Sequence, residues 1–212
     1  GIPQATALIR QELKPTVTSF DKTLQKNDQV GLCNISVDLP EDISKTSTGL
    51  RHFIKKWGEI QVIAPTITMC KDINLQIHSS YRLDSDGNAK PSVSCAKSIG
   101  LDDMIVCTKN LHHKGLTNGS LGILTHIFDS PTAVTGQDGE VELCHAIANC
   151  DGQEINLSAK DFNHIELGYC ITAHKAQGSG FERVIIATPK SKVIDNSWIY
   201  TAISRAKKQA II

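Results

Sequence analysis

The sequence predicts an α/β protein: a parallel sheet with flanking helices that carries a small inserted β-barrel. Two observations predict this fold. Before Leu101 the apolar residues alternate between helical and strand spacing, as in a parallel α/β sheet. From there to about Gly168 only short strands separated by turn signals follow, which is typical of a small barrel. The α/β pattern then resumes and continues to the end of the 212-residue chain.

The first part of the chain alternates between the two kinds of element. Leu50, Phe53, Ile54 and Trp57 recur at helical spacing, and the stretch from Ile60 is a short apolar run of buried-strand type. Beyond these elements, residues 84–98 are rich in turn signals and are expected to form an exposed loop. The elements predicted before that loop are a helix at 1–14, a strand at 30–36, a helix at 41–57, a strand at 60–64 and a helix at 66–78.

The middle of the chain is predicted to contain strands alone. Asp138-Gly139 and Asp151-Gly152 mark turns between them. These patterns place the α/β domain at residues 1–110 and 166–212 and the insertion at residues 111–165. The predicted strands are 104–108, 121–128, 140–147, 154–157 and 164–167.

The end of the chain is predicted to hold a strand and a helix. Val184-Ile185-Ile186 follows a glycine-containing turn and is a buried-type strand, and Asp195, Asn196 or Ser197 can cap the helix after it. This helix is expected to reach Lys208 and to present Arg205 on its outward face. A fixed arginine suits the charge that spreads over a transferring phosphoryl group, although solvated helix faces also carry arginine.

Composition points to no particular partner. The 22 basic and 22 acidic residues cancel, so nucleic-acid binding would depend on local cations such as Arg51, Lys55 and Lys56, or the run from His112 to Lys114. Each of these clusters also fits an ordinary solvated face. There is no signal peptide and no apolar run of about twenty residues that could span a membrane.

The cysteines indicate reduced thiols in a cytoplasmic protein. Their number is odd, they are scattered, and several lie within apolar runs. Cys144-His145 and Cys150 lack the Cys-x-x-Cys spacing of zinc sites, so no metal is expected. The seven are Cys33, Cys70, Cys95, Cys107, Cys144, Cys150 and Cys170.

Two segments resemble motifs of a known family. Residues 171–186, ITAHKAQGSGFERVII, and residues 200–212, YTAISRAKKQAII, are similar to motifs V and VI of superfamily 1 helicases. The similarity is strongest to the branch of the exodeoxyribonuclease V alpha subunit and the conjugative relaxase helicases. Residues 104–124 resemble the segment that opens an SH3-like insertion there, with Ser120 in place of the usual aspartate. The resemblance implies a RecA-like second motor domain, also called the UvrD-like helicase C-terminal domain.

The resemblance assigns roles to the residues of both motifs. Arg205 matches the motif VI arginine, the catalytic residue that contacts the terminal phosphate of ATP. Gly178 and Gly180 fall at nucleotide-binding positions, although many relatives have a glutamate where Gly180 stands. The positions that contact DNA and link it to the nucleotide site are Thr172, His174, Lys175 and Gln177.

The sequence contains neither a phosphate-binding Gly-x-x-x-x-Gly-Lys-Ser/Thr loop nor an Asp-Glu pair. ATP and Mg²⁺ are therefore expected to be held mainly by a missing N-terminal RecA-like domain, with single-stranded DNA as the second partner. The start at Gly1 and the apolar end at Ile212 favour a C-terminal fragment of a DNA helicase, although a complete small protein is the alternative. The parent could serve recombination or conjugation.

Two other functions remain open. One is a non-catalytic nucleic-acid-binding module that reuses a helicase domain. It predicts strand binding that depends on salt but not on ATP. The other is an independent hydrolase that uses Cys170 or Ser179 with His174, for which no nucleophile elbow or base-orienting partner can be recognised.

Overall fold

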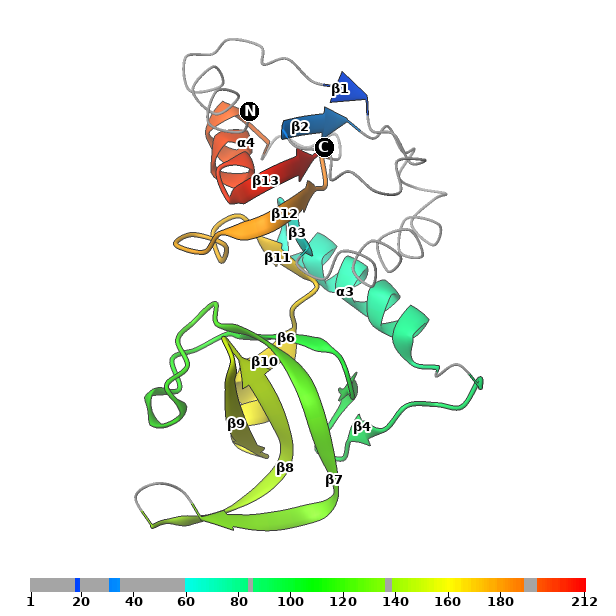
Figure 1. The fold of residues 1–212 in the computed structure, drawn as a ribbon, viewed down its shortest axis with the longest axis vertical. Coiled ribbons are helices and arrows are strands. Elements are labelled where there is room, and N and C mark those ends of the chain that lie inside the picture. The colour runs from blue at the N-terminus through cyan, green and yellow to red at the C-terminus, as the bar shows by residue number, and fades with distance from the viewer. Residues whose placement is uncertain (1–17, 20–30, 35–59, 84–85, 136–138, 189–193) are drawn as a thin grey trace. The chain divides into compact units, whose positions relative to one another are not determined.

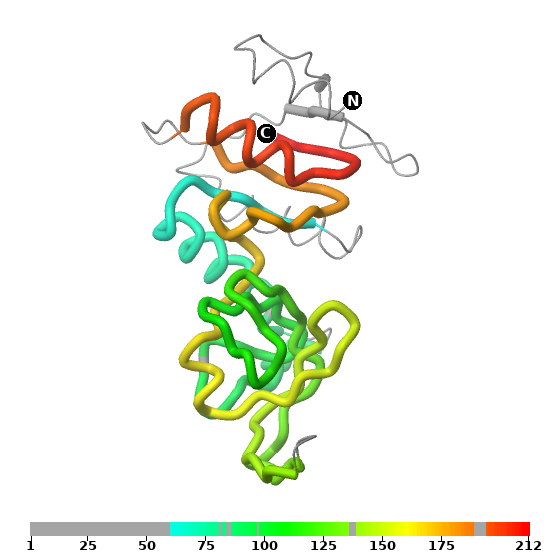
Figure 2. The backbone as a smooth tube through the Cα atoms, turned by 90° about the vertical axis from the view of Figure 1, so that its left-hand side faces the viewer, coloured from blue at the N-terminus to red at the C-terminus, as the bar shows by residue number. Residues whose placement is uncertain are grey.

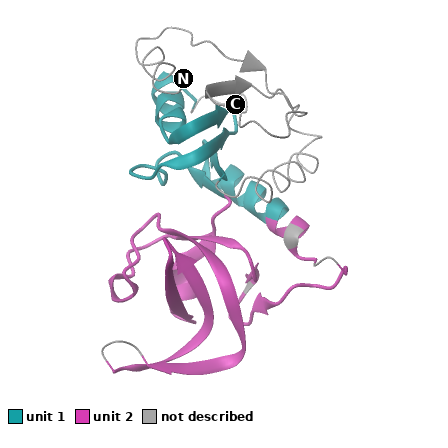
Figure 3. Ribbon diagram, in the orientation of Figure 1, with its two compact units in different colours: residues 1–77, 170–212 teal, residues 78–169 magenta. Residues whose placement is uncertain are grey.

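The protein is described by a computed structural model that covers residues 18–19, 31–34, 60–83, 86–135, 139–188 and 194–212. The chain divides into two compact units, which Figure 3 distinguishes by colour. Unit 1 comprises residues 1–77 and 170–212, and unit 2 comprises residues 78–169. The predicted helices at 1–14 and 41–57 and the cluster of Arg51, Lys55 and Lys56 lie outside the described residues.

Unit 1 is built on a parallel sheet, as predicted. Its strand order is β1-β2-β13-β12-β3-β11, and every neighbouring pair runs parallel (Figure 1). All five residues of β3 are buried, as expected for a central strand covered on both faces. The strands are β1 (Thr18–Ser19), β2 (Gly31–Asn34), β3 (Ile60–Ala64), β11 (Cys170–Thr172), β12 (Phe181–Ile186) and β13 (Ala206–Ile211).

Helix α3 (Ile67–Tyr81) follows β3 and confirms the helix predicted there. It begins after Thr66, whose side-chain oxygen accepts a hydrogen bond from the backbone N–H of Met69 at 3.2 Å. That bond satisfies a donor which the first helical turn leaves free. Further along the helix, Asn74 reaches strand β11. Its side chain accepts a bond from the N–H of Cys170 at 2.7 Å and donates one to the carbonyl of Cys170 at 3.0 Å.

Helix α4 (Asn196–Ile203) is shorter than predicted. Asp195 caps it by accepting a hydrogen bond from the N–H of Trp198 at 2.7 Å, which confirms one of the three cap candidates. The helix stops at Ile203, however, and Lys207 and Lys208 lie on strand β13. The prediction of a helix through Lys208 was wrong because pairing with β12 and β2 fixes these residues as a strand.

Unit 2 contains an antiparallel sheet with the order β10-β6-β7-β8-β9. This order is linear and does not close into a ring, so the sheet is confirmed while the predicted barrel is not. The 3₁₀ turns η1 (His112–Lys114) and η2 (Asp161–His164) connect its strands. The strands are β6 (Met104–Cys107), β7 (Leu121–Thr135), β8 (Val141–Cys150), β9 (Gln153–Ser158) and β10 (Ile165–Leu167), and a separate pair consists of β4 (Ser92–Val93) and β5 (Ala96–Gly100).

Unit 2 begins earlier than the boundary placed at residue 111. Strand β6 pairs with β7 and β10, so it belongs to the antiparallel sheet rather than to the parallel one. The stretch predicted as a loop at 84–98 contains β4 and the start of β5, which was missed because both strands are short and flanked by turn residues. The compact unit therefore starts at His78.

Asp103 connects the two ends of unit 2. Its carboxylate is buried and accepts hydrogen bonds from His78 Nδ1 at 2.7 Å, from the N–H of Gly100 at 2.6 Å and from the Tyr169 hydroxyl at 2.7 Å. His78 and Tyr169 are the first and last residues of the unit. Three donors thus compensate the burial of one carboxylate and hold both chain ends together.

None of the helices in the described ranges is long and apolar enough to cross a membrane. Six cysteines are free thiols: Cys70, Cys95, Cys107, Cys144, Cys150 and Cys170. Five of them are buried, as the sequence predicts, whereas Cys95 is exposed.

Candidate nucleotide and nucleic-acid site

Arg205 lies in the turn between α4 and β13. The guanidinium is half-buried, and the partners recorded for it are all neutral oxygens. Nη1 donates to the carbonyl of Ser179 at 3.3 Å, Nη2 donates to the Ser204 hydroxyl at 2.9 Å, and Nε lies 3.3 Å from the carbonyl of Thr201. Neutral partners fix the orientation of the fork without cancelling its charge, so Arg205 is suited to bind an anion.

The turn that meets Arg205 contains two exposed glycines, Gly178 and Gly180. Gly178 has φ +84°, a left-handed conformation that a residue with a Cβ rarely adopts. Directly after the turn, the N–H of Phe181 donates to the carbonyl of Arg205 at 2.8 Å. The backbone and the side chain of Arg205 therefore both contact the segment from Ser179 to Phe181.

The segment after β11 folds into a series of tight turns. The hydroxyl of Thr172 accepts a hydrogen bond from the N–H of Lys175 at 3.2 Å, and the carbonyl of Thr172 accepts one from the N–H of Ala176 at 3.0 Å. Thr172 thus acts as a local cap. His174 and Gln177 are exposed and Lys175 is half-buried, and all three lie on one short stretch.

The sheet register separates the candidate residues into two groups. Thr172 pairs with Ala64 at the carboxyl end of β3, whereas Arg183 in β12 pairs with Ile60 at its amino end. Residues 173–180 therefore run back from the carboxyl ends of the strands to their amino ends, a path that can be followed in Figure 2. The four predicted DNA-contacting residues begin this segment. Gly178, Gly180 and Arg205 lie at its end.

Residues 173–180 lie within a stretch of the chain that is similar to a known domain family. Residues 167–212 match the UvrD-like helicase C-terminal domain. These residues are thus similar to the C-terminal domain of superfamily 1 helicases. Over 164 residues, or 71% of the chain, it is 24% identical to the ATP-dependent RecD2 DNA helicase of Deinococcus radiodurans. A 54-residue stretch, 24% of the chain, is 48% identical to an uncharacterised protein of Methanocaldococcus jannaschii.

Solved structures of Pif1 helicases align with this chain at TM-scores below 0.5. The Pif1 helicase of Candida albicans aligns with a TM-score of 0.49 at 14% identity, over 82% of this chain and 50% of that one. Bacteroides Pif1 in complex with ADP-AlF4 aligns at 0.44 and 16% identity, over 99% and 48%. The chain thus spans about half of these structures, 19% of RecD2 and 5% of the Methanocaldococcus protein.

Lys207 lies beside Gly180, the position at which the sequence resemblance suggested a glutamate. A Cβ placed at residue 180 would be 3.2 Å from Cε of Lys207. Next to it, Glu182 forms an ion pair with Lys208 at 2.7 Å, and this contact lowers the pKa of the Glu182 carboxyl. Strand β13 thus places Lys207 against the turn, and Lys208 of the same strand forms an ion pair with Glu182.

The geometry gives no support to an independent hydrolase. Burial raises the pKa of the Cys170 thiol well above its usual value, which disfavours the nucleophilic thiolate. Among the described residues, no hydrogen bond joins the His174 ring to Cys170 or Ser179. A nucleophile needs such an adjacent base.

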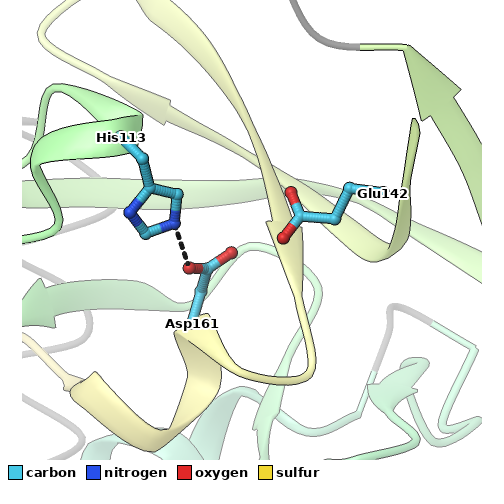
Figure 4. Close-up of side chains that lie close together, drawn as sticks. All are labelled: His113, Glu142 and Asp161. Atoms are coloured by element: carbon cyan, nitrogen blue, oxygen red, sulfur yellow. Dashed lines mark hydrogen bonds and ion pairs between the residues drawn. The ribbon is translucent and has the colours of Figure 1, made fainter. Parts of the chain in front are cut away.

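Three side chains in unit 2 could contribute ligands to a metal ion. His113, Glu142 and Asp161 come from η1, β8 and η2, and their nearest ligand atoms lie within 4.8 Å of one another (Figure 4). His113 Nε2 contacts Asp161 Oδ1 at 3.1 Å. Because these residues are far apart in the sequence, the cysteine spacing that was used to look for zinc could not find them.

A lysine already neutralises this group. The ammonium of Lys114 forms an ion pair with Glu142 and lies 3.7 Å from Asp161 Oδ2, which also accepts bonds from the N–H and hydroxyl of Ser158 at 2.9 Å each. Burial alone would raise the pKa of Glu142, but the hydrogen bonds from Lys114 and Ser158 outweigh it and lower that pKa. We therefore assign the cluster to charge compensation within the sheet.

Sequence reasoning found the arginine and the glycines but missed the groups that hold them. The partners of Arg205 include the backbone carbonyls of Ser179 and Thr201, and a backbone carbonyl leaves no mark in the sequence. Lys207 was assigned to a helix rather than to a strand beside Gly180. The register of β13 with β12, which no local pattern contains, decides that placement.

Proposed function

We propose that this domain is the second motor half of an ATP-dependent DNA helicase that translocates on single-stranded DNA. The observation that carries the proposal is the contact between the guanidinium of Arg205 and the turn from Gly178 to Gly180. This contact places a side chain suited to bind an anion next to exposed glycines at the amino end of β12. A guanidinium held in this way can stabilise charge on the terminal phosphate of ATP.

In this proposal ATP and Mg²⁺ bind mainly to a first motor domain, which supplies the phosphate-binding loop that the present sequence lacks. Arg205 completes the nucleotide site from the opposite side. ATP binding then closes the cleft between the two domains, and hydrolysis reopens it. Glu182 follows the turn in β12, but its carboxylate is already paired with Lys208 and is therefore not assigned to magnesium.

The DNA strand would contact the other end of the same segment. His174 and Gln177 are exposed, and Lys175 adds a positive charge, so the stretch offers hydrogen-bond donors to phosphate oxygens. The aligned structures include a Bacteroides Pif1 bound to single-stranded DNA, and the similar RecD2 protein is an ATP-dependent DNA helicase. We infer that unit 2 corresponds to the SH3-like insertion of such motors and that the protein acts in the cytoplasm.

Coupling between nucleotide and strand tests the proposal. The affinity of the full-length protein for a single-stranded oligonucleotide would be measured over a series of salt concentrations, with and without a non-hydrolysable ATP analogue. A helicase motor predicts that the analogue changes this affinity severalfold. The alternative, a non-catalytic binding module, predicts the same affinity in both conditions.

A pair of variants locates the contact. His174→Ala combined with Gln177→Ala should weaken strand binding about thirtyfold, since each of the two lost phosphate contacts costs on the order of 1 kcal/mol. The exposed Gln153 on β9 provides a matched control, and Gln153→Ala should leave the affinity unchanged. Equal affinities for the double variant and the control would remove this segment from the DNA interface.

A further inference from the structure

Two buried cysteines of unit 1 lie on a helix and a strand that are hydrogen-bonded to each other, although 100 positions separate the cysteines in the chain. Cys70 is in the first turn of α3, and Cys170 is the first residue of β11. Their exposed fractions are 6% and 1%. Neither residue is part of the proposed nucleotide or DNA contacts, so the proposed function gives no reason for a thiol at these positions.

Asn74 fixes the spacing between the helix and the strand that carry the two cysteines. Its side chain makes two hydrogen bonds to the backbone of Cys170, at 2.7 and 3.0 Å. Cys70 is four residues earlier on the same helix, so its side chain leaves the same face one turn away. The helix face that carries Cys70 is therefore held against the start of β11.

The two thiols differ in acidity. A hydrogen bond from the Cys170 side chain lowers the pKa of Cys70 more than burial raises it, and the Ala64 backbone and the positive charge of Lys175 lower it further. Burial raises the pKa of Cys170, and the hydrogen bond to Cys70 raises it as well. The pair thus consists of one thiol whose pKa is lowered and one whose pKa is raised, which is the combination of an attacking and a resolving thiol.

We propose that Cys70 and Cys170 form an oxidation site that closes to a disulfide when the protein meets a hydroperoxide. The Cys70 thiolate attacks the outer oxygen of the peroxide, the O–O bond breaks, and the alkoxide or hydroxide that leaves takes up a proton. The Cys170 sulfur then attacks the resulting sulfenic acid at Cys70. The S–O bond breaks, and the released hydroxide leaves as water with the Cys170 proton. One peroxide is reduced and two thiols are oxidised.

The bond would join α3 covalently to β11, two residues before Thr172. This inference does not depend on the helicase proposal, because it concerns only the chemistry of the two thiols.

The other cysteines provide controls within the same molecule. Cys95 is exposed, so it reports whether the oxidant reaches surface thiols. Cys150 is buried near Cys107, and burial raises the pKa of Cys150 to about 11. Cys107 and Cys150 are thus a second pair of buried thiols, and because the pKa of Cys150 is raised they are expected to stay reduced.

The test is peptide mapping by mass spectrometry under non-reducing conditions. The purified full-length protein is titrated with hydrogen peroxide, quenched with an alkylating agent and digested. We expect a linked peptide that contains Cys70 and Cys170, while Cys107 and Cys150 are alkylated only after unfolding. Oxidation of Cys95 with Cys70 and Cys170 still reduced would overturn the proposal. So would over-oxidation of Cys70 to a sulfinic acid without any linked peptide.

A single substitution traps the intermediate. In Cys170→Ser the resolving thiol is absent, but the hydroxyl can still donate a hydrogen bond to Cys70. Cys70 should therefore accumulate as a sulfenic acid that a 1,3-diketone probe labels after the protein is unfolded. Cys150→Ser is the matched control, and it should keep the linked peptide at wild-type yield. Thermal unfolding of both variants verifies that they are folded. A folded Cys170→Ser variant in which Cys70 takes up no probe would contradict the assignment, and this readout is independent of the wild-type map.

Discussion

The guanidinium of Arg205 donates from Nη1 to the carbonyl oxygen of Ser179 at 3.3 Å, across 26 positions of the chain. This bond joins the two segments that resemble helicase motifs V and VI, and the backbone bond from Phe181 to Arg205 reinforces it at 2.8 Å. The arginine is thus positioned by the turn that contains Gly178 and Gly180. A substitution in that turn should therefore change the position of the Arg205 side chain although Arg205 itself is unchanged.

Gly178→Ala tests the turn. The φ of +84° places residue 178 in the left-handed region, where a Cβ costs about 1–2 kcal/mol. We expect the free energy of unfolding in urea to fall by that amount. Gly178→Asn is the control, because asparagine tolerates this conformation and should cost less than alanine. Equal losses for both substitutions would show that the backbone conformation is not the cause.

Asn74→Ala tests the connection between α3 and β11. The substitution leaves the buried N–H and C=O of Cys170 without their partner, at about 1–3 kcal/mol for each group. We expect a loss of roughly 2–6 kcal/mol in chemical denaturation. The exposed Leu75, one position along the same helix, is the matched control, and Leu75→Ala should stay within about 0.5 kcal/mol of the wild type.

Glu142→Gln tests the charge cluster of unit 2 through its pH dependence. The pKa of Glu142 is lowered in the folded protein, so its charge stabilises the fold above the unfolded value of 4.5 and ceases to do so as pH falls through the folded value. Because the side chain is 36% exposed, we expect an effect below about 1 kcal/mol at pH 7. The difference between wild type and variant should vanish at acidic pH. Denaturation at a series of pH values measures it, and a difference that persists below both pKa values would contradict the account.

The elements predicted most accurately are those with strong local patterns. The strand Ile60–Ala64 is a continuous apolar run, and the helix after it has apolar residues at helical spacing, so both were found close to their observed limits. The glycine at 178 was expected to lie in a turn, and its positive φ agrees with that expectation.

The errors arose where a distant part of the chain decides the structure. Residues 206–208 follow a helix and have helical spacing, yet they form a strand because β12 and β2 lie on either side. Strand β6 has an ordinary buried-strand pattern, which does not reveal that its partners are β7 and β10. Strand β7 continues past Pro131, where the register shifts between Ile127 and Thr132, although proline usually marks a strand end.

The candidate site shows the same division. Arg205 and the glycines could be found because their motif is contiguous in the sequence. The carbonyl of Ser179 and the contact between Cys70 and Cys170 could not be found in this way, since both depend on how the segments pack.

The measurement that tests the central claim most directly is single-strand-stimulated ATP hydrolysis by the full-length protein and its Arg205→Ala variant. If Arg205 contacts the terminal phosphate in the transition state, kcat should fall by about 10³–10⁵ while ATP binding is largely kept. Arg205→Lys should also be impaired, because lysine lacks the planar fork. Unchanged turnover in a folded Arg205→Ala variant would contradict the assignment of this domain as a motor half.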